Sequence, residues 1–367
     1  MSNTDVTLSD PRQGHTADTP GNVDRESIAE YPGRLSGQNY LPVLDCLRGI
    51  AALSVCLFHF CGNSDLFPLG DPLRTAGSFG WLGVEAFFVI SGFVIPYSLH
   101  MRSYRLSDGG QFLLRRLVRL EPPYFACILV VLGFYLLRML FPGPKVDQET
   151  LCLTQIAAHA AYANAIIGYK WINPVFWTLA IEFQYYLFVG LVFPLINSRS
   201  VVVSVSTLCG VASLGFVGRG NTSLLPHWLP LFAIGMLAFR YKVSAVNAGV
   251  ALCQLVVIST VSLYVIGVVQ TIVGVATASA ILLFGKASLP PYAKPFMAAG
   301  TISYSLYLLH FPVGLRVINV ANRLPEHWLY RYGGVAAALI VSLVAAAVFY
   351  RLVERPSQAW SKRLGDR

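Results

Sequence analysis

The sequence predicts an all-α integral membrane protein with about ten transmembrane helices and both termini in the cytoplasm. Of its 367 residues, 55% are hydrophobic and only 12% are charged, whereas a soluble domain carries about 25% charged residues. The mean hydropathy is +0.59. Apolar windows of about 20 residues, the length that crosses a bilayer as a helix, recur along most of the chain. These observations exclude an ordinary soluble domain.

The chain divides into three parts by composition. Residues 1–39 are polar, with six acidic residues against three arginines, and cannot bury enough apolar surface to fold. They also lack the basic and then apolar layout of a cleavable signal. We therefore expect a disordered cytoplasmic tail over 1–39, a membrane domain over 40–356 and a cytoplasmic C-terminal tail over 357–367.

Ten apolar windows are predicted to span the membrane, of which the fifth, sixth and eighth are short or weak. They cover residues 41–61, 81–101, 117–141, 174–197, 201–217, 225–240, 247–267, 270–286, 296–316 and 333–353.

The distribution of basic residues predicts the orientation. With the N-terminus inside, eighteen Lys and Arg residues fall on the cytoplasmic side and eight on the outer side, as the positive-inside rule requires. The formal net charge of +9 is accounted for by basic residues in the predicted cytoplasmic loops. We therefore expect no nucleic-acid partner. The predicted location is the inner, or plasma, membrane.

The cysteines indicate no metal site. All seven are scattered, none forms a C-x-x-C pair, and most lie in apolar windows. Neither a zinc site nor a disulfide framework is expected.

The first window contains a polar stripe. At 100° per residue, Arg48 and His59 lie within about 20° of one helix face, with Asp45 about 60° from Arg48. The rise from Arg48 to His59 is about 16 Å, which places Arg48 toward the cytoplasm and His59 in the outer half. A single histidine in an apolar helix is more often a packed residue than a catalytic one, so the stripe alone does not decide its role.

Three more ionisable residues lie in predicted spans, where each is costly unless paired or facing a cavity. The predicted spans "GWLGVEAFFVISGFVIP", with Glu85, and "NPVFWTLAIEFQYYLF", with Glu182, both begin at the outer side of the membrane. In "SYSLYLLH", Ser303, Tyr307 and His310 lie on one helix face. We predict that both acids share the level of the two histidines. The alternative is that they only hold helices together by hydrogen bonds.

An arginine cluster, "FLLRRLVRLEPPYF", is predicted at the cytoplasmic mouth. Such clusters are most often topology signals. However, Arg116 and Arg119 lie one turn apart on a helix, directly before Glu121-Pro122-Pro123. Such a pair can bind a phosphate bidentately.

Together these motifs resemble the membrane-bound acyltransferase 3 family over about residues 40–356. Two positions depart from the family pattern: Cys46 replaces a common glycine, and Phe183 replaces a common second glutamate after Glu182. The matching motifs, in order, are "LDCLRGIAALSVCLFHF", "GVEAFFVISGFVI", "RRLVRLEPPYF", "FWTLAIEFQYYLF", "SYSLYLLH" and "VERP".

The resemblance implies transfer of an acyl group, commonly acetyl, from cytoplasmic acyl-CoA to a hydroxyl of a carbohydrate or small natural product. Arg116 and Arg119, with Arg48, would hold the CoA phosphates, and His59 would be the general base. Catalytic partners are expected among the two acids and the second histidine, Glu182 first, then His310 and Glu85. A transporter or flippase that uses the buried acids and histidines as a proton relay is the alternative. Broken helices at mid-membrane and an inverted repeat would favour it, whereas the arginine pair and the asymmetric set of motifs do not.

Overall fold

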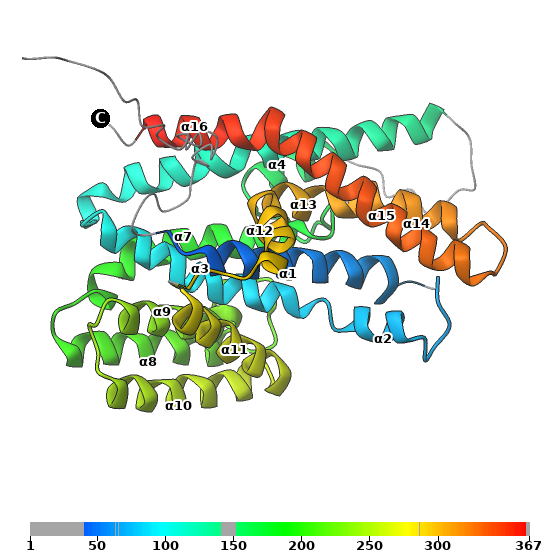
Figure 1. Cartoon of the computed structure of the whole chain (residues 1–367). Coiled ribbons are helices and arrows are strands. Elements are labelled where there is room, and N and C mark those ends of the chain that lie inside the picture. The colour runs from blue at the N-terminus through cyan, green and yellow to red at the C-terminus, as the bar shows by residue number, and fades with distance from the viewer. Residues whose placement is uncertain (1–39, 63, 65, 141–151, 286, 365–367) are drawn as a thin grey trace, which may run out of the picture.

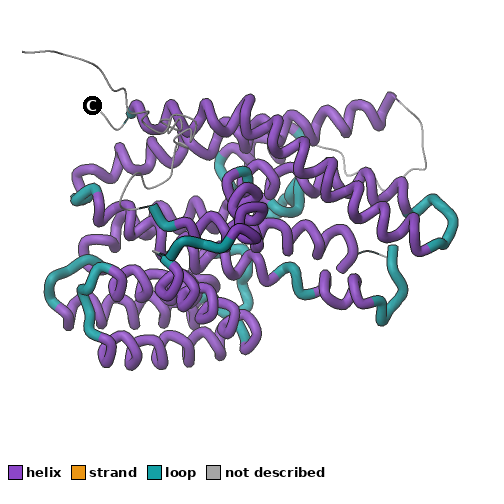
Figure 2. The backbone as a smooth tube through the Cα atoms, viewed as in Figure 1, coloured by secondary structure: helices purple, strands orange, loops and turns teal. Residues whose placement is uncertain are grey.

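The computed structural model describes residues 40–62, 64, 66–140, 152–285 and 287–364, and every regular element in this part of the chain is helical (Figures 1 and 2). The tail predicted over 1–39 lies outside the described residues. The α-helices are α1 Pro42–Leu57, α2 Pro72–Ser78, α3 Leu82–Met101, α4 Gly109–Leu140, α5 Leu153–Ala160, α6 Asn164–Ile167, α7 Phe176–Ile196, α8 Val201–Val217, α9 Leu225–Lys242, α10 Ala248–Val265, α11 Val268–Phe284, α12 Lys294–Thr301, α13 Ser303–Leu309, α14 Leu315–Ala321, α15 Trp328–Phe349 and α16 Arg355–Arg363.

Local sequence signals start several of these helices. The Asp71 carboxylate accepts hydrogen bonds from the backbone N–H groups of Leu73 and Arg74 at the start of α2. The side chains of Ser200 and Asn247 cap α8 and α10 in the same way. Each cap satisfies an N–H group that the first helical turn cannot pair internally.

The helices form three neighbouring groups (Figure 1). α9 lies among α3, α8, α10 and α11 on one side of the molecule, and most of its side chains are buried. α4, α15 and α16 lie on the other side, and α1, α3 and α7 run between the two groups. The middle group, α1, α3 and α7, therefore lies next to both outer groups.

Six helical stretches among the described residues are long and apolar enough to cross a membrane, which confirms a multi-span membrane protein. They are Pro42–Gly62, Pro72–Met101, Leu106–Leu140, Phe176–Ile196, Ala248–Val265 and Trp328–Arg363. Two shorter apolar helices, α8 and α11, match the predicted fifth and eighth spans, and α9 matches the sixth. The count of ten spans and the cytoplasmic placement of the termini stay predictions.

The ninth predicted span is not one helix. Residues 296–316 are divided among α12, α13, a π-helical turn at His310–Gly314 and the start of α14. The first break falls at Ile302, between α12 and α13. Backbone of this kind at membrane depth is tolerated where it is buried in protein or lines a polar cavity.

Three π-helical turns follow α-helices in the described part of the chain. They are Phe58–Gly62 after α1, His310–Gly314 after α13 and Tyr350–Glu354 after α15. Because π-turns of this kind occur often at functional sites, the positions of His59, His310 and Glu354 in them indicate where the site lies.

The segment predicted as a C-terminal tail from residue 357 contains most of α16, which packs on α4. The Ser357 hydroxyl lies 2.7 and 2.8 Å from the carbonyl oxygens of Val118 and Arg119. The Ser361 hydroxyl donates to the Arg115 carbonyl at 2.7 Å. The serines therefore tie residues 357–364 to the arginine-bearing part of α4, so the described part of this segment packs on the membrane domain.

Two glycines let α1 and α12 cross in close contact. A Cβ atom added to Gly49 would lie 1.9 Å from the carbonyl oxygen of Phe296, and one added to Gly300 would lie 1.8 Å from that of Asp45. Both opposing atoms belong to the backbone, so no side-chain movement can relieve the clash. The position of Asp45 beside the polar interior thus depends on a glycine in α12.

We predict that Gly300→Ala separates α1 from α12 and lowers the free energy of unfolding by about 1–3 kcal/mol, the usual cost of overpacking. Thermal unfolding in detergent measures this. Gly133→Ala in α4 is the matched control, because its added methyl meets open space and alanine favours helices. Equal melting temperatures for the two variants would contradict the close-contact argument.

Candidate active site

A polar cavity lies inside the bundle among α1, α3, α4, α7, α13 and α16. It consists of a chamber of about 150 Å³ and a vestibule of about 660 Å³. The two spaces adjoin, because they share lining residues: Arg48, Ser91, Arg119, Glu182 and Gln358. Groups far apart in the sequence therefore face one continuous cavity.

The cavity follows the length of α3. Val84 lines only the chamber, Ser91 lines both spaces and Ser98 lines only the vestibule. Thr178 and Tyr186 of α7 show the same order from chamber to vestibule. The vestibule thus lies toward the C-terminal end of α3, and the chamber ends near the N-terminal ends of α3 and α7.

The vestibule is rich in positive charge. Six basic side chains line it, against two acidic ones: Arg48, Arg102, Arg115, Arg116, Arg119 and Lys362, with Asp108 and Glu182. The Arg116 guanidinium lies 5.5 Å from the ring centroids of both Phe112 and Tyr186. These cation–π contacts orient its planar fork. The arrangement suits an anionic ligand.

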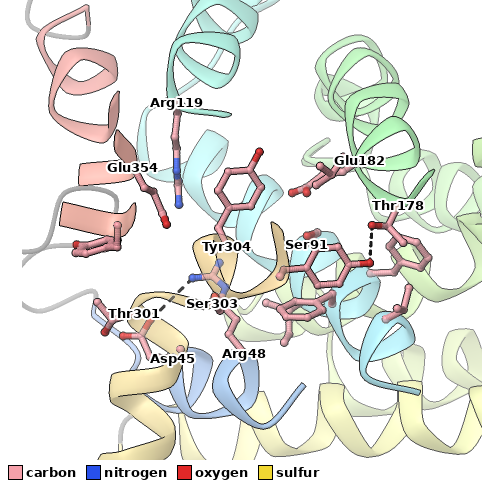
Figure 3. A pocket seen from close by; sticks show the side chains of 18 of the residues that line it. Asp45, Arg48, Ser91, Arg119, Thr178, Glu182, Thr301, Ser303, Tyr304 and Glu354 are labelled. Carbon is pink, nitrogen blue, oxygen red and sulfur yellow. Dashed lines mark hydrogen bonds and ion pairs between the residues drawn. The ribbon is translucent and has the colours of Figure 1, made fainter. Parts of the chain in front are cut away.

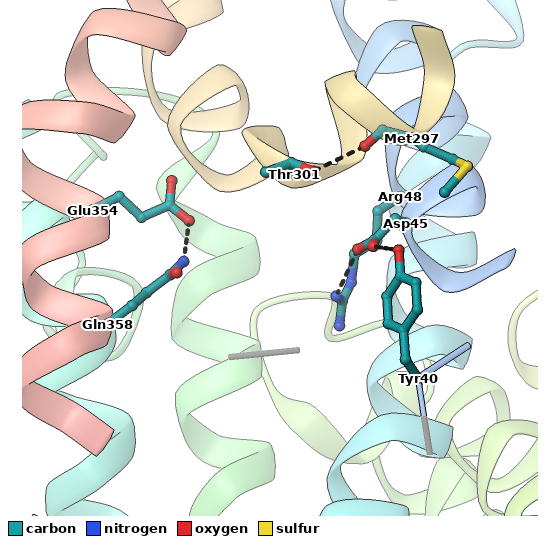
Figure 4. Close-up of polar contacts among 7 residues, drawn as sticks. All are labelled: Tyr40, Asp45, Arg48, Met297, Thr301, Glu354 and Gln358. Carbon is teal, nitrogen blue, oxygen red and sulfur yellow. Dashed lines mark hydrogen bonds and ion pairs between the residues drawn. The ribbon is translucent and has the colours of Figure 1, made fainter. Parts of the chain in front are cut away.

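Arg48 is held by its own helix at the boundary between vestibule and chamber (Figures 3 and 4). Its guanidinium lies 3.9 Å from the Asp45 carboxylate, which also accepts a hydrogen bond of 2.6 Å from the Tyr40 hydroxyl. Asp45 is 5% exposed. The buried acid therefore fixes the arginine without removing it from the cavity wall.

Glu354 presents a second buried carboxylate to the chamber. It accepts hydrogen bonds from the backbone N–H of Ser305 at 3.1 Å, from the Ser305 hydroxyl at 2.5 Å and from the Gln358 amide at 2.7 Å. Figure 3 shows its side chain beside Arg119. Glu354 thus joins α13 to α16 at the level of the arginines.

The far end of the chamber is closed by a pair of hydroxyls. Thr178 and Tyr307 lie 2.8 Å apart, oxygen to oxygen, and both are buried (dashed line beside Thr178 in Figure 3). Beyond Tyr307, the His310 ring lies 5.8 Å from the tyrosine ring, centroid to centroid. A histidine therefore lies next to one of the tyrosines that line the chamber.

The two histidines, which the sequence analysis expected at one level of the membrane, lie next to each other. The rings of His59 and His310 lie 5.3 Å apart, centroid to centroid, and Phe311 lies edge-on to His59. His310 is fully buried and its Nδ1 lies 3.1 Å from the Leu306 carbonyl oxygen. Since a carbonyl only accepts, neutral His310 carries its proton on Nδ1 and a lone pair on Nε2.

A family model described as an acyltransferase domain matches residues 41–349. The chain belongs to the acyltransferase 3 family. It is 26% identical over 365 residues to the O-acetyltransferase OatA of Staphylococcus aureus, covering 88% of this chain and 58% of OatA. It is 25% identical over 348 residues to a Komagataeibacter xylinus protein named membrane-bound transacylase BcsY, covering 87% and 83% of the two chains. No solved structure shows significant similarity.

In this acyltransferase 3 chain, Glu182 does not lie where the sequence analysis placed it. It faces the vestibule and chamber, accepts a hydrogen bond from the Tyr186 hydroxyl and interacts electrostatically with Arg48 and Arg116. The physical reason is helical rise: Thr178, which contacts Tyr307, lies one turn before Glu182 in α7, so Glu182 lies about 6 Å further along the helix, toward the arginines.

Glu85 lies in the first turn of α3 with its carboxylate buried, and its Oε2 atom has no hydrogen-bond partner among the described residues. Neither a hydrogen bond nor an ion pair joins it to His59 or His310 in this part of the chain. The structure therefore groups Glu182 with the arginines and leaves Glu85 outside the cavity lining. Among the described residues, no group of three or more His, Cys, Asp and Glu side chains is arranged to hold a metal ion.

Two residues that line the chamber were not predicted as site residues, although each lies in a motif that the sequence shows. Glu354 is the acid of "VERP", and Tyr307 lies on the predicted face with His310. A signal was therefore present for both. Assigning them required knowing that the segments bearing them meet at one chamber.

We predict that Glu354→Ala lowers the free energy of unfolding by about 1–3 kcal/mol, because buried donors of Ser305 and Gln358 lose their acceptor. Chemical unfolding in detergent measures the loss. Glu326→Ala is the matched control, since that side chain is 89% exposed and surface pairs contribute little. A Glu354 variant as stable as the Glu326 variant would show that the buried network is not needed.

Proposed function

We propose that the chain is an inner-membrane O-acyltransferase that moves an acetyl group from cytoplasmic acyl-CoA to a hydroxyl of a carbohydrate. The observation that carries this proposal is the continuous cavity, which begins at a basic vestibule and ends at Tyr307 in front of the histidine pair. Such a cavity can hold an elongated ligand with a charged end and a reactive end.

The vestibule fits the phosphate-bearing end of the donor. Arginine forks bind phosphates bidentately, and Arg116 and Arg119 line the vestibule with Arg48. The narrower chamber fits the pantetheine arm, whose amide and hydroxyl groups match polar lining residues such as Ser91 and Gln358. The thioester would then reach the hydroxyl pair at the end of the chamber.

His59 is the proposed general base. It is the less buried of the two histidines, so an acceptor from the other side of the membrane can reach it more readily than His310. The acceptor oxygen attacks the thioester carbonyl carbon while His59 takes the hydroxyl proton. The C–S bond then breaks, and the CoA thiolate leaves and takes that proton from the histidinium. His310, fixed by Leu306, holds the His59 ring in place.

The relatives support O-acylation in particular. OatA is named an O-acetyltransferase and BcsY a transacylase. The chain spans just under three fifths of OatA's length, so its own acceptor is proposed from the family resemblance as a carbohydrate hydroxyl.

Two further points concern this site: the side of the membrane that the vestibule faces, and the alternative that the chain is a transporter. The positive-inside count supports a cytoplasmic vestibule, where acyl-CoA is available. The break between α12 and α13 is the feature that the transporter alternative predicted. Family membership favours acyl transfer instead, and the break supplies chamber-lining residues such as Thr301 and Ser303.

We predict that inverted membrane vesicles transfer label from added acetyl-CoA to a glycan acceptor, whereas sealed right-side-out vesicles do not. His59→Ala should reduce this transfer by at least about 10²-fold through loss of a general base while leaving thermal stability intact. His327→Ala, at the exposed start of α15, is the control and should retain wild-type turnover. Transfer by right-side-out vesicles alone would reverse the proposed orientation, and full turnover of His59→Ala would exclude the base.

We also predict that Arg116→Lys and Arg119→Lys each raise the KM for acetyl-CoA about tenfold, equivalent to about 1.4 kcal/mol. Lysine keeps the charge that topology requires but loses the bidentate fork and the ring stacking. The acceptor KM should change little. Arg331→Lys, on a side chain paired with exposed Glu326, is the control. Unchanged acetyl-CoA saturation in both vestibule variants would place phosphate binding elsewhere.

A further inference from the structure

The hydroxyl pair at the end of the chamber has a defined direction of hydrogen bonding. Thr178 Oγ1 lies 2.9 Å from the Val175 carbonyl oxygen and 2.8 Å from the Tyr307 hydroxyl oxygen. A carbonyl can only accept, and threonine has one hydroxyl proton. Thr178 therefore donates to Val175, and Tyr307 must donate to Thr178. The Tyr307 proton points at a neutral oxygen on the chamber wall.

Tyr307 differs in this respect from two other tyrosines that line the cavity. The Tyr304 hydroxyl donates to the Leu120 carbonyl at 3.0 Å, and the Tyr186 hydroxyl donates to the Glu182 carboxylate. Backbone carbonyls and carboxylates are stronger acceptors than a threonine hydroxyl. Of these three hydroxyls, Tyr307 is thus the one that can most readily exchange its present acceptor for the carbonyl oxygen of a ligand.

The position of Tyr307 is also distinctive. It lines the chamber between Phe87, whose ring centroid is 6.0 Å from its own, and His310 at 5.8 Å. Neither His59 nor His310 lines the chamber. Tyr307 is therefore a chamber-lining residue whose ring also contacts one of the two histidines.

We propose that the Tyr307 hydroxyl is a catalytic residue that donates a hydrogen bond to the thioester carbonyl oxygen in the transition state, with Thr178 as its acceptor in the resting protein. This inference rests on the proposed acyl transfer. As the acceptor oxygen bonds to the carbonyl carbon, the carbonyl π electrons move onto oxygen, and Tyr307 turns its O–H from Thr178 to this oxyanion. When the C–S bond breaks, the carbonyl re-forms and the O–H returns to Thr178. Tyr307 keeps its proton throughout.

An oxyanion donor strengthens its bond only as charge develops, so its removal lowers kcat more than it raises KM. We expect Tyr307→Phe to lower kcat by about 10²- to 10³-fold, with the acetyl-CoA KM and the dissociation constant for CoA within about threefold of wild type. The assay is transfer from acetyl-CoA in inverted vesicles, with CoA binding measured on purified protein.

Thr178→Val separates this catalytic role from a structural one. It removes the same resting hydrogen bond but leaves the Tyr307 hydroxyl able to donate, so its loss of kcat should be at least about tenfold smaller than that of Tyr307→Phe. Tyr124→Phe controls for loss of a buried tyrosine hydroxyl, because that hydroxyl donates to the His159 carbonyl at 3.2 Å away from the cavity. It should retain wild-type turnover.

Equal losses in Tyr307→Phe and Thr178→Val would overturn the proposal, since the pair would then act only as a structural bond. Wild-type kcat in Tyr307→Phe would overturn it as well. If Tyr307→Phe fails to fold, 3-fluorotyrosine at position 307 keeps the shape and makes the hydroxyl more acidic. A change in kcat of more than threefold would support the proposal, and an unchanged kcat would exclude it. Absence of transfer by the wild-type protein would instead refute the proposed function itself.

Discussion

Charged side chains in an apolar bundle are stable only when they are paired or face a polar space, and the rest of the site depends on this constraint. Asp45, Arg48, Arg119, Glu182 and Glu354 come from four separate parts of the chain, yet all line one chamber. Gathering opposite charges around a shared cavity reduces the desolvation cost of each. The same gathering creates a polar cavity inside an otherwise hydrophobic protein.

The departures from regular α-helix lie in or near the wall of this cavity. Two of the π-turns bear the paired histidines, and the third bears Glu354. A π-turn shifts the face on which later residues lie, and a helix break frees backbone groups that only a polar lining can satisfy. The third π-turn and the break between α12 and α13 thus contribute residues to the chamber wall, whereas the two histidine-bearing turns lie next to each other outside it.

Different contacts hold the two arginine-bearing walls of the cavity in place. On the α1 side, a glycine contact with α12 holds Asp45 and Arg48 by backbone shape alone. On the α4 side, serine hydroxyls of α16 bond to backbone carbonyls beside the arginines. Both devices fix the backbone that carries an arginine and leave its guanidinium facing the cavity, as a site for an anionic ligand requires.

The sequence alone determined the membrane class and most of the long helices, and it identified the arginine cluster and the two histidines as candidates. Hydropathy and helical period depend only on neighbours in the chain, so they can be read without knowledge of the packing. Tertiary structure decided that Glu182 faces the arginines, that Tyr307 closes the chamber and that α16 belongs to the domain. Helical period assigns a residue to a face but does not say which helix that face meets, because this depends on packing among segments distant in sequence.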